Sequence, residues 1–192
     1  MTDFITLLHE ICSQLESSNI SELTFLCKDL IPQKFCNGKQ DTDLFIILYE
    51  RCYIDENNTS LIEELLFYLK RYDLLQKHFN VSTNTMVERL KNPAMAKISP
   101  YRHLLYELGN LVSNSKLVEV KRNFTDILPK VTLEKVTNLW DLFIEFEKKD
   151  MIRKDNLDYL KQMSEYVEDE NFKELILSYE KSKAVKKTSL QP

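Results

Sequence analysis

Apolar residues recur three and four positions apart along most of the chain, which is the spacing of a helix face. In the first half, this spacing predicts helices near residues 3–15, 19–31, 41–53, 59–70 and 72–79, with a short irregular helix around 33–38. In the second half, it predicts helices near residues 100–112, 115–128, 138–150, 155–166 and 169–182, with a short turn around 131–136. The pattern is typical of an all-α protein.

Polar residues and prolines mark the ends of several predicted helices. Side chains that favour helix starts precede the second, fourth and fifth helices, at Ser17–Asn19, Asp41 and Asn58–Ser60. Pro32 and Pro129 follow the second helix of each half, and the residue before a proline disfavours helical backbone. We therefore expect the second helix to end at the same place in both halves.

The two halves are copies of one unit. When the sequence is shifted by 97 residues, Leu7-Leu8 aligns with Leu104-Leu105, and Pro32 aligns with Pro129. After a one-residue adjustment, LFIILYERCYIDENN aligns with LFIEFEKKDMIRKDN. Two copies are too few for a solenoid. The repeat predicts two six-helix antiparallel bundles packed in tandem.

The domain boundaries follow from this repeat. We expect domain 1 at residues 1–80, a linker with a short helix at 81–98, domain 2 at 99–182 and a basic, frayed tail at 183–192. Ser82 or Thr83 is a suitable cap for the linker helix, which ends before Pro93.

Composition narrows the class of protein. Two glycines and five prolines leave few tight turns, which favours helices over sheet. A net charge of −4 argues against nucleic-acid binding, and no apolar run is long enough for membrane insertion. The N-terminus lacks the basic region of a secretory signal, and the four cysteines form no C-x-x-C pair. These features predict a cytoplasmic protein with reduced thiols, no bound metal and no cofactor.

One position differs between the copies in an informative way. On a helical wheel, Leu23 and Cys27 define the core face of the second helix, and Phe25 falls roughly opposite. We therefore expect Phe25 to face solvent or an interface. Arg122 takes the corresponding outward place in the second copy, and Asn123 takes the place of Leu26.

These residues resemble the death effector domains, six-helix bundles of the death-fold superfamily. "TFLCKDLIP" carries the Phe-Leu pair that the family has on its second helix, and "RYDL" gives Arg71, Asp73 and Leu74 for its R-x-D-L motif. The tandem arrangement over residues 1 to about 182 resembles the prodomains of initiator caspases and the FLIP proteins.

The chain departs from the family pattern at several places. The acidic member of the family's charge triad falls on Asn19, an amide, with Glu22 one turn further on as a partial substitute. The same place in the second copy is Lys116, a charge reversal, and the Phe-Leu pair there is Arg122-Asn123. No R-x-D-L motif follows in the second copy.

The resemblance implies roles for these residues. It implies that Phe25 and Leu26 pack between the two domains, together with Phe67. It also implies that partners bind through two sets of residues at the helix corners and on the outer helix face, namely Arg71, Asp73, Leu74, Glu22, Asn19, Lys116, Arg122 and Asn123. The implied partners are a FADD-type adaptor and initiator-caspase prodomains, with self-association as a further possibility.

Catalysis is not expected. The chain has no caspase Q-A-C-x-G motif, its histidines at 9, 78 and 103 are scattered, and it has no phosphate-binding glycine loop. The leading hypothesis is a FLIP-like regulator that caps initiator-caspase assembly in the death-inducing signalling complex. Two alternatives stay open: the prodomain of an initiator caspase, and a scaffold that activates NF-κB signalling.

Overall fold

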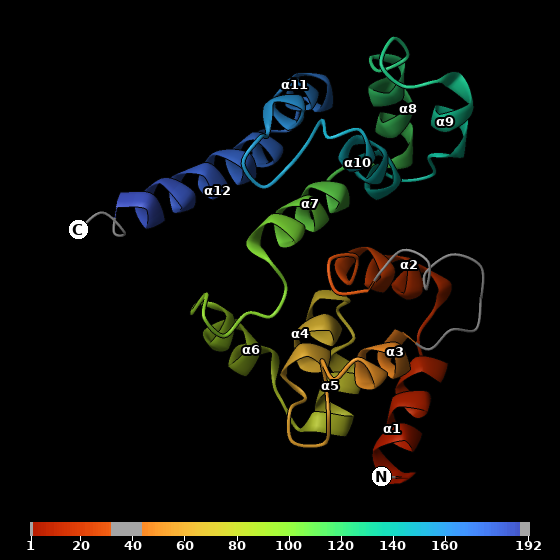
Figure 1. Ribbon diagram of the computed structural model, residues 1–192, viewed down its shortest axis with the longest axis vertical. Helices are drawn as coiled ribbons and strands as arrows, with labels where there is room; N and C mark the ends of the chain where they lie inside the picture. The colour runs from red at the N-terminus through yellow and green to blue at the C-terminus, as the bar shows by residue number, and fades with distance from the viewer. Residues whose placement is uncertain (1, 32–43, 189–192) are drawn as a thin grey trace. The chain divides into compact units, whose positions relative to one another are not determined.

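The computed structural model describes residues 2–31 and 44–188 and divides the chain into two compact units, Met1–Ser99 (unit 1) and Pro100–Pro192 (unit 2). The described residues form helices and no strand beyond two isolated bridges (Figure 1). This confirms the all-α, death-fold class. The irregular helix predicted around 33–38, the cap at Asp41, Pro32 and Cys36 lie outside the described residues.

Unit 1 contains six described helices, which Figure 1 labels in chain order. They are α1 (Thr2–Ser13), α2 (Ser17–Leu26), α3 (Leu44–Glu50), α4 (Ser60–Tyr68), α5 (Tyr72–Phe79) and α6 (Thr83–Leu90).

The second helix is shorter than predicted and begins earlier. Glu16 is the N-cap of α2 and forms a capping box with Asn19, so Asn19 lies inside the first turn and not ahead of the helix. The helix ends at Leu26 with Cys27 as its C-cap, and the chain continues as turns. The prediction of a helix to residue 31 was wrong because the turn residues Cys27 and Ile31 are also buried, which continued the apolar pattern.

Left-handed residues break the chain around α5. Lys70 has φ 57° before the helix, and Asn80 has φ 52° after it, where it caps the last turn. Asparagine tolerates this backbone region better than most residues. The helix therefore occupies Tyr72–Phe79, where the sequence predicted it.

The core of unit 1 is mostly aliphatic. Fully or nearly fully buried side chains come from every described helix of the unit, namely Leu8, Ile11, Leu23, Phe45, Leu48, Leu65, Leu74 and Met86. Burying one such side chain contributes about 1.5–3 kcal/mol to folding. Met86 lies on α6, and α6 packs against α4, so the predicted linker helix is part of this unit.

Unit 2 repeats the arrangement with a different core. Its helices are α7 (Pro100–Asn110), α8 (Asn114–Arg122), α9 (Lys130–Lys135), α10 (Leu139–Lys148), α11 (Asp158–Val167) and α12 (Glu170–Thr188). Phe124 packs against Phe146 with ring centroids 5.0 Å apart and against Tyr166 at 6.0 Å. The corresponding residues of unit 1 are Cys27, Leu48 and Tyr68, so this cluster has three aromatic rings where unit 1 has one.

Several predictions in unit 2 need correction. A helix was expected over 115–128, but α8 ends at Arg122 and the chain continues as turns, as it does after α2. Residues 131–136 were expected to form a turn, but α9 is a helix with Pro129 at its N-cap. The last helix was expected to end at 182, with a frayed tail beyond, but α12 continues to Thr188. No helix among the described residues is long and apolar enough to cross a membrane.

Candidate interaction surface

The R-x-D-L motif forms an ion pair at the start of α5. Arg71 donates two hydrogen bonds to the Asp73 carboxylate, from Nε at 2.9 Å and from Nη2 at 2.7 Å. The hydrogen bond to Asp73 raises the pKa of Arg71, and the bond from Arg71 lowers the pKa of Asp73. The Arg71 side chain is 20% exposed and that of Asp73 is 61% exposed, so the pair displays its carboxylate to solvent.

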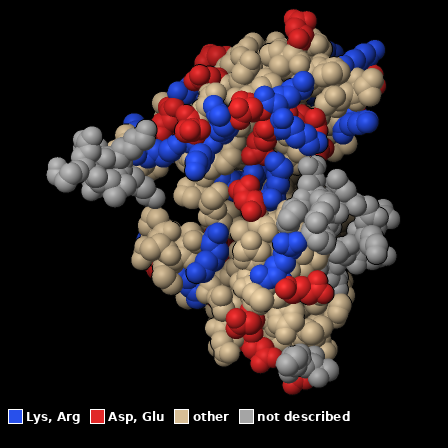
Figure 2. Space-filling view, viewed as in Figure 1, with Lys and Arg blue, Asp and Glu red and all other residues tan. Residues whose placement is uncertain are grey.

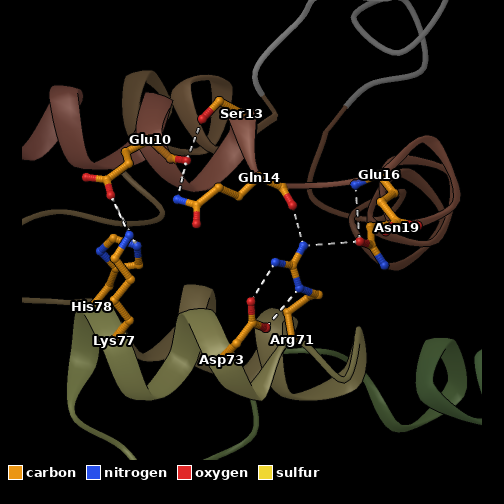
Figure 3. Close-up of polar contacts among 9 residues, drawn as sticks. All are labelled: Glu10, Ser13, Gln14, Glu16, Asn19, Arg71, Asp73, Lys77 and His78. Atoms are coloured by element: carbon orange, nitrogen blue, oxygen red, sulfur yellow. Dashed lines mark hydrogen bonds and ion pairs between the residues drawn. The ribbon is translucent and has the colours of Figure 1, made fainter.

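Arg71 also joins α5 to the corner between α1 and α2 (Figure 3). Its Nη1 donates to the backbone oxygen of Gln14 and to Asn19 Oδ1 at 3.5 Å. Asn19 therefore occupies the place beside the motif arginine, where it accepts a hydrogen bond without adding a charge. We call Gln14, Asn19, Arg71 and Asp73 the unit 1 corner.

The sequence analysis did not single out Glu16. Its charge contributes to the raised pKa of Arg71, after the larger effects of Asp73 and of burial. The signal was the spacing of Glu16 and Asn19, which form the capping box at the start of α2. Glu16 is thus a second acidic residue, after Asp73, whose charge acts on Arg71.

Leu74 and the neighbouring aromatic residues have different exposures. Leu74 is buried in the core and fixes α5 in place. Phe67 is half-buried and its ring lies 5.9 Å from that of Tyr68 and 5.8 Å from that of Tyr72. Tyr72 is among the exposed large side chains. Phe67, Tyr68 and Tyr72 therefore form a cluster of neighbouring rings at the end of α4 and the start of α5.

A second polar link joins the far end of α5 to α1. Lys77 Nζ donates to Glu10 Oε1 at 2.7 Å, and the largely buried His78 lies 3.9 Å from the same oxygen (Figure 3). The hydrogen bond from Lys77 lowers the pKa of Glu10. The His78 Nε2 atom is buried and makes no hydrogen bond among the described residues.

Phe25 and Leu26 are both buried, with 2% and 1% of their surfaces exposed. A solvent-facing Phe25, one of the two predicted possibilities, is therefore excluded. The packing of Phe25, Leu26 and Phe67 between the domains stays a prediction.

The matching corner of unit 2 has the opposite polarity. Lys116 stands where unit 1 has Asn19, and its Nζ lies 2.7 Å from Glu119 and 3.6 Å from Glu168. Glu168 is left-handed and precedes α12, as Lys70 precedes α5. The hydrogen bond with Glu119 raises the pKa of Lys116 and lowers that of Glu119. We call Lys116, Glu119 and Glu168 the unit 2 corner.

The outer face of α8 is exposed and polar around the position of the Phe-Leu pair. Arg122 and Asn123 are exposed, and the Asn123 side chain donates to the Glu119 carbonyl at 2.9 Å. Val118, one turn before Arg122, is also exposed. We call Val118, Arg122 and Asn123 the α8 outer face.

The chemistry of these places is that of protein contacts. Among the described residues, no group of three or more His, Cys, Asp and Glu side chains could hold a metal ion. Figure 2 shows acidic and basic side chains interleaved on one face, without a large area of a single sign. Such mixed surfaces set partner choice and register in protein–protein binding.

The fold and these surfaces define a class: paired death-fold bundles whose distinctive residues lie at helix corners and outer faces. The family model for the death effector domain matches residues 4–84 and 101–182. The chain belongs to the death effector domain family, and both of its units are members.

Three relatives illustrate the range of similar proteins. The chain is 35% identical to mouse (Mus musculus) caspase-8 over 98% of its own length and 39% of the relative's. It is 36% identical to the mouse FAS-associated death domain protein over 40% of the chain and 38% of the relative. It is 28% identical to the mouse CASP8 and FADD-like apoptosis regulator over 81% of the chain and 31% of the relative. The chain thus spans about two fifths or less of these proteins.

A solved structure shares the fold. The crystal structure of the viral FLIP MC159 matches with a TM-score of 0.78 at 20% identity, over 94% of this chain and 97% of that one. This match confirms the tandem death-fold architecture predicted from the sequence.

Proposed function

We propose that this chain is a non-catalytic regulator of death-receptor apoptosis signalling that acts through homotypic death effector domain contacts. In this role it binds a FADD-type adaptor or an initiator-caspase prodomain and caps the growing assembly, as a FLIP-like inhibitor. Membership of the family over both units supports the mode of binding. Similarity to an adaptor, to a caspase and to an apoptosis regulator supports the pathway.

The observation that carries the capping role is the contrast between α2 and α8. Phe25 and Leu26 are buried, whereas Arg122 and Asn123 at the matching positions are exposed. Head-to-tail assembly needs two different working faces on each subunit. A subunit whose α8 outer face has a cation and an amide in place of the apolar pair joins an assembly but does not extend it.

The test is reconstitution with a FADD-type adaptor and a caspase-8 prodomain. Adding the full chain should shorten the prodomain assemblies seen by electron microscopy and reduce caspase cleavage in cells that express all three proteins. The chain alone should form no long filaments. Filaments of the chain alone, or seeding of caspase oligomers as efficient as that by an intact prodomain, would contradict the proposal.

A gain-of-function variant tests the α8 outer face directly. Arg122→Phe together with Asn123→Leu should restore extension, because it returns the apolar pair to an exposed helix face. The matched control is Arg153→Phe with Lys154→Leu, which adds the same two apolar side chains to an exposed loop of the same unit. If both double variants assemble equally, the gain reflects general stickiness and the proposal loses its support.

The unit 1 corner is the proposed binding place for the adaptor, with Glu22 one turn after Asn19 on α2. Leu74 was expected to meet the partner, but it is buried and only holds α5 in place. Arg71→Ala should weaken adaptor binding, measured by titration calorimetry. Lys77→Ala is the matched control, since it removes another surface ion pair of the same helix. Equal binding by the two variants would argue against this assignment.

The alternative is the prodomain of an initiator caspase, which the 35% identity to mouse caspase-8 over nearly the whole chain favours. The chain would then recruit a catalytic domain and activate it by proximity. The natural transcript distinguishes the two: a stop codon after Pro192 supports the regulator, and an open frame into a protease domain supports the prodomain.

A further inference from the structure

The chain between the two family-matched regions is folded onto unit 1. The first family match ends at residue 84 and the second begins at residue 101. The segment between them includes most of α6. α6 packs against α4, with Met86 fully buried, and Ile98 near the end of the segment is also buried (Figure 1). We call residues 83–98 the strap.

Glu64 of α4 binds the end of the strap. This side chain is only 1% exposed, and its two carboxylate oxygens accept hydrogen bonds from the backbone N–H groups of Lys97, at 2.6 Å, and Ile98, at 3.2 Å. A buried carboxylate is strongly destabilising unless such donors satisfy it. The position of the backbone at residues 97–98 is therefore coupled to the core of unit 1.

Glu63, the neighbouring residue, binds the helix of the strap. Its Oε2 accepts a hydrogen bond from Arg89 in the last turn of α6, and its Oε1 accepts one from Thr59 Oγ1 at 2.6 Å. The Glu63 side chain is largely buried, so this pair is less screened than one on an open surface. Two adjacent carboxylates thus fix the strap at two separate points.

We propose that Glu63 and Glu64 form a latch that holds the strap on unit 1, so that the chain leaves this unit only at Ser99. Pro100 begins α7, and a residue before proline is restricted to extended backbone. Ser99 itself donates a hydrogen bond from its hydroxyl to Asp29 Oδ2 of unit 1 at 3.4 Å. Release of the latch should detach residues 83–98 from unit 1 and expose Met86 and Ile98, which are buried in the latched chain. This inference does not depend on the proposed signalling role.

Hydrogen exchange of the full chain, read by mass spectrometry, tests the latch. Glu64→Gln keeps the shape of the side chain but turns an amide donor toward one of the two backbone N–H groups. Exchange of the strap should rise about tenfold or more, while α1, α3 and unit 2 keep their wild-type rates. Arg89→Gln should give a smaller rise confined to α6.

Glu88→Gln is the matched control. Glu88 lies on α6 next to Arg89 and pairs with Lys91 of the same segment at 2.6 Å, with both side chains exposed. Exchange should be unchanged in this variant. Trypsin gives a second readout, since cleavage after Lys97 should accelerate in Glu64→Gln and not in Glu88→Gln.

Several outcomes would overturn the latch. One is a strap that exchanges at the unprotected rate in the wild-type chain. Another is equal exchange in Glu64→Gln and the Glu88→Gln control. A third is loosening spread evenly over unit 1, which would make Glu64 an ordinary core residue. If Glu64→Gln fails to fold, Arg89→Gln decides the question, because this variant removes the cation of the Glu63–Arg89 pair and leaves both carboxylates in place.

Discussion

The first helix of each unit packs on a neighbouring helix through different chemistry. The two pairs are α1 with α3 in unit 1 and α7 with α10 in unit 2. In unit 1, α1 packs on α3 through Phe4 and Tyr49, whose ring centroids are 5.7 Å apart. In unit 2, α7 packs on α10 through an ion pair between Arg102 and Glu147, with Arg102 Nη2 2.8 Å from Glu147 Oε1. Arg102 is 1% exposed, so the fold tolerates a buried charge at a place where its copy has apolar and aromatic residues.

The corners differ in sign but not in position. In the unit 1 corner, the cation Arg71 reaches from the start of α5 to α2. In the unit 2 corner, the cation Lys116 reaches from α8 to Glu168, ahead of α12. The charge is also reversed between α4 and α11. Glu63 of α4 pairs with Arg89, whereas Lys161, which aligns with Glu63, lies 2.7 Å from Glu180.

This contrast teaches that the bundle specifies which helices are joined, and not which partner carries the charge. An ion pair joins two helices equally well whichever helix carries the cation, since the interaction energy depends on distance and environment. The sign at each corner is therefore free to serve recognition. Surfaces of the two units can diverge while the helices that carry them stay in place.

The largest expected effect comes from breaking the buried pair of unit 2. Glu147→Ala removes the carboxylate that pairs with the buried Arg102 guanidinium, and breaking a buried ion pair costs about 3–5 kcal/mol of unfolding free energy. Trp140 is the only tryptophan of the chain and lies in unit 2. Its fluorescence during urea unfolding therefore reports on this unit.

The control for this change transplants the unit 1 residues. Arg102→Ile with Glu147→Tyr installs the residues found at positions 5 and 49, where Tyr101 can play the part of Phe4. Replacing a buried pair by apolar groups is often close to neutral. A double variant as unstable as Glu147→Ala would show that the two contacts are not interchangeable.

Gly109 gives the next largest effect. A Cβ atom added there would lie 1.9 Å from Trp140 Nε1, which stacks on Tyr106 and donates to the Tyr106 carbonyl at 3.2 Å. Gly109→Ala must displace the indole and should cost about 1–3 kcal/mol, which outweighs the ~1 kcal/mol that alanine gains in helix propensity. Unit 1 has Cys12 at this position, so the requirement belongs to unit 2 alone.

Near-UV circular dichroism and thermal unfolding measure this change. The tryptophan signal should weaken and the unfolding temperature of unit 2 should fall. A variant more stable than the wild type, with an unchanged tryptophan spectrum, would mean that the ring moves aside freely.

The sequence predicted most helices because their apolar spacing is regular, and α5 was placed to the residue. It failed where turns and short helices carry the same signal. Residues 27–31 continue the apolar pattern of α2 in a turn, with Ile31 N donating to Cys27 O at 2.9 Å. α9 has six residues, which is too few for its periodicity to be distinguished from that of a turn.

The sites were only partly predictable for a related reason. The motif Arg71-x-Asp73-Leu74 is local, so the closeness of its two charges could be foreseen, whereas Leu74 was expected at a partner surface and is buried. The partner of Arg102 lies 45 residues away in the sequence, and only the packing of α7 on α10 brings it close. Glu16 was missed because its effect on Arg71 acts across the contact between α2 and α5.

Asn19→Asp sharpens the comparison of the corners with a smaller effect. It places a carboxylate beside Arg71, whose Nη1 already lies 3.5 Å from Asn19 Oδ1, and should stabilise unit 1 by about 0–1 kcal/mol. Lys116→Glu in unit 2 should act in the opposite direction, because it adds a third carboxylate next to Glu119 and Glu168. Slower hydrogen exchange of α1 and α2 in the first variant, and faster exchange of α8 in the second, would confirm both signs.

Acid sensitivity of the unit 1 corner is the smallest expected effect. Arg71 lowers the pKa of Asp73 in the folded state, chiefly through a side-chain hydrogen bond, so the unfolded chain binds this proton more readily. The stabilisation is therefore present above the unfolded pKa of about 4 and is lost as pH falls through the lower folded value. Since Asp73 is mostly exposed, the loss should stay under about 1 kcal/mol.

Urea unfolding followed by far-UV circular dichroism should show a smaller loss of unfolding free energy between neutral pH and acid for Asp73→Asn than for the wild type. Identical pH profiles would mean that Arg71 binds Gln14 and Asn19 just as well without its carboxylate.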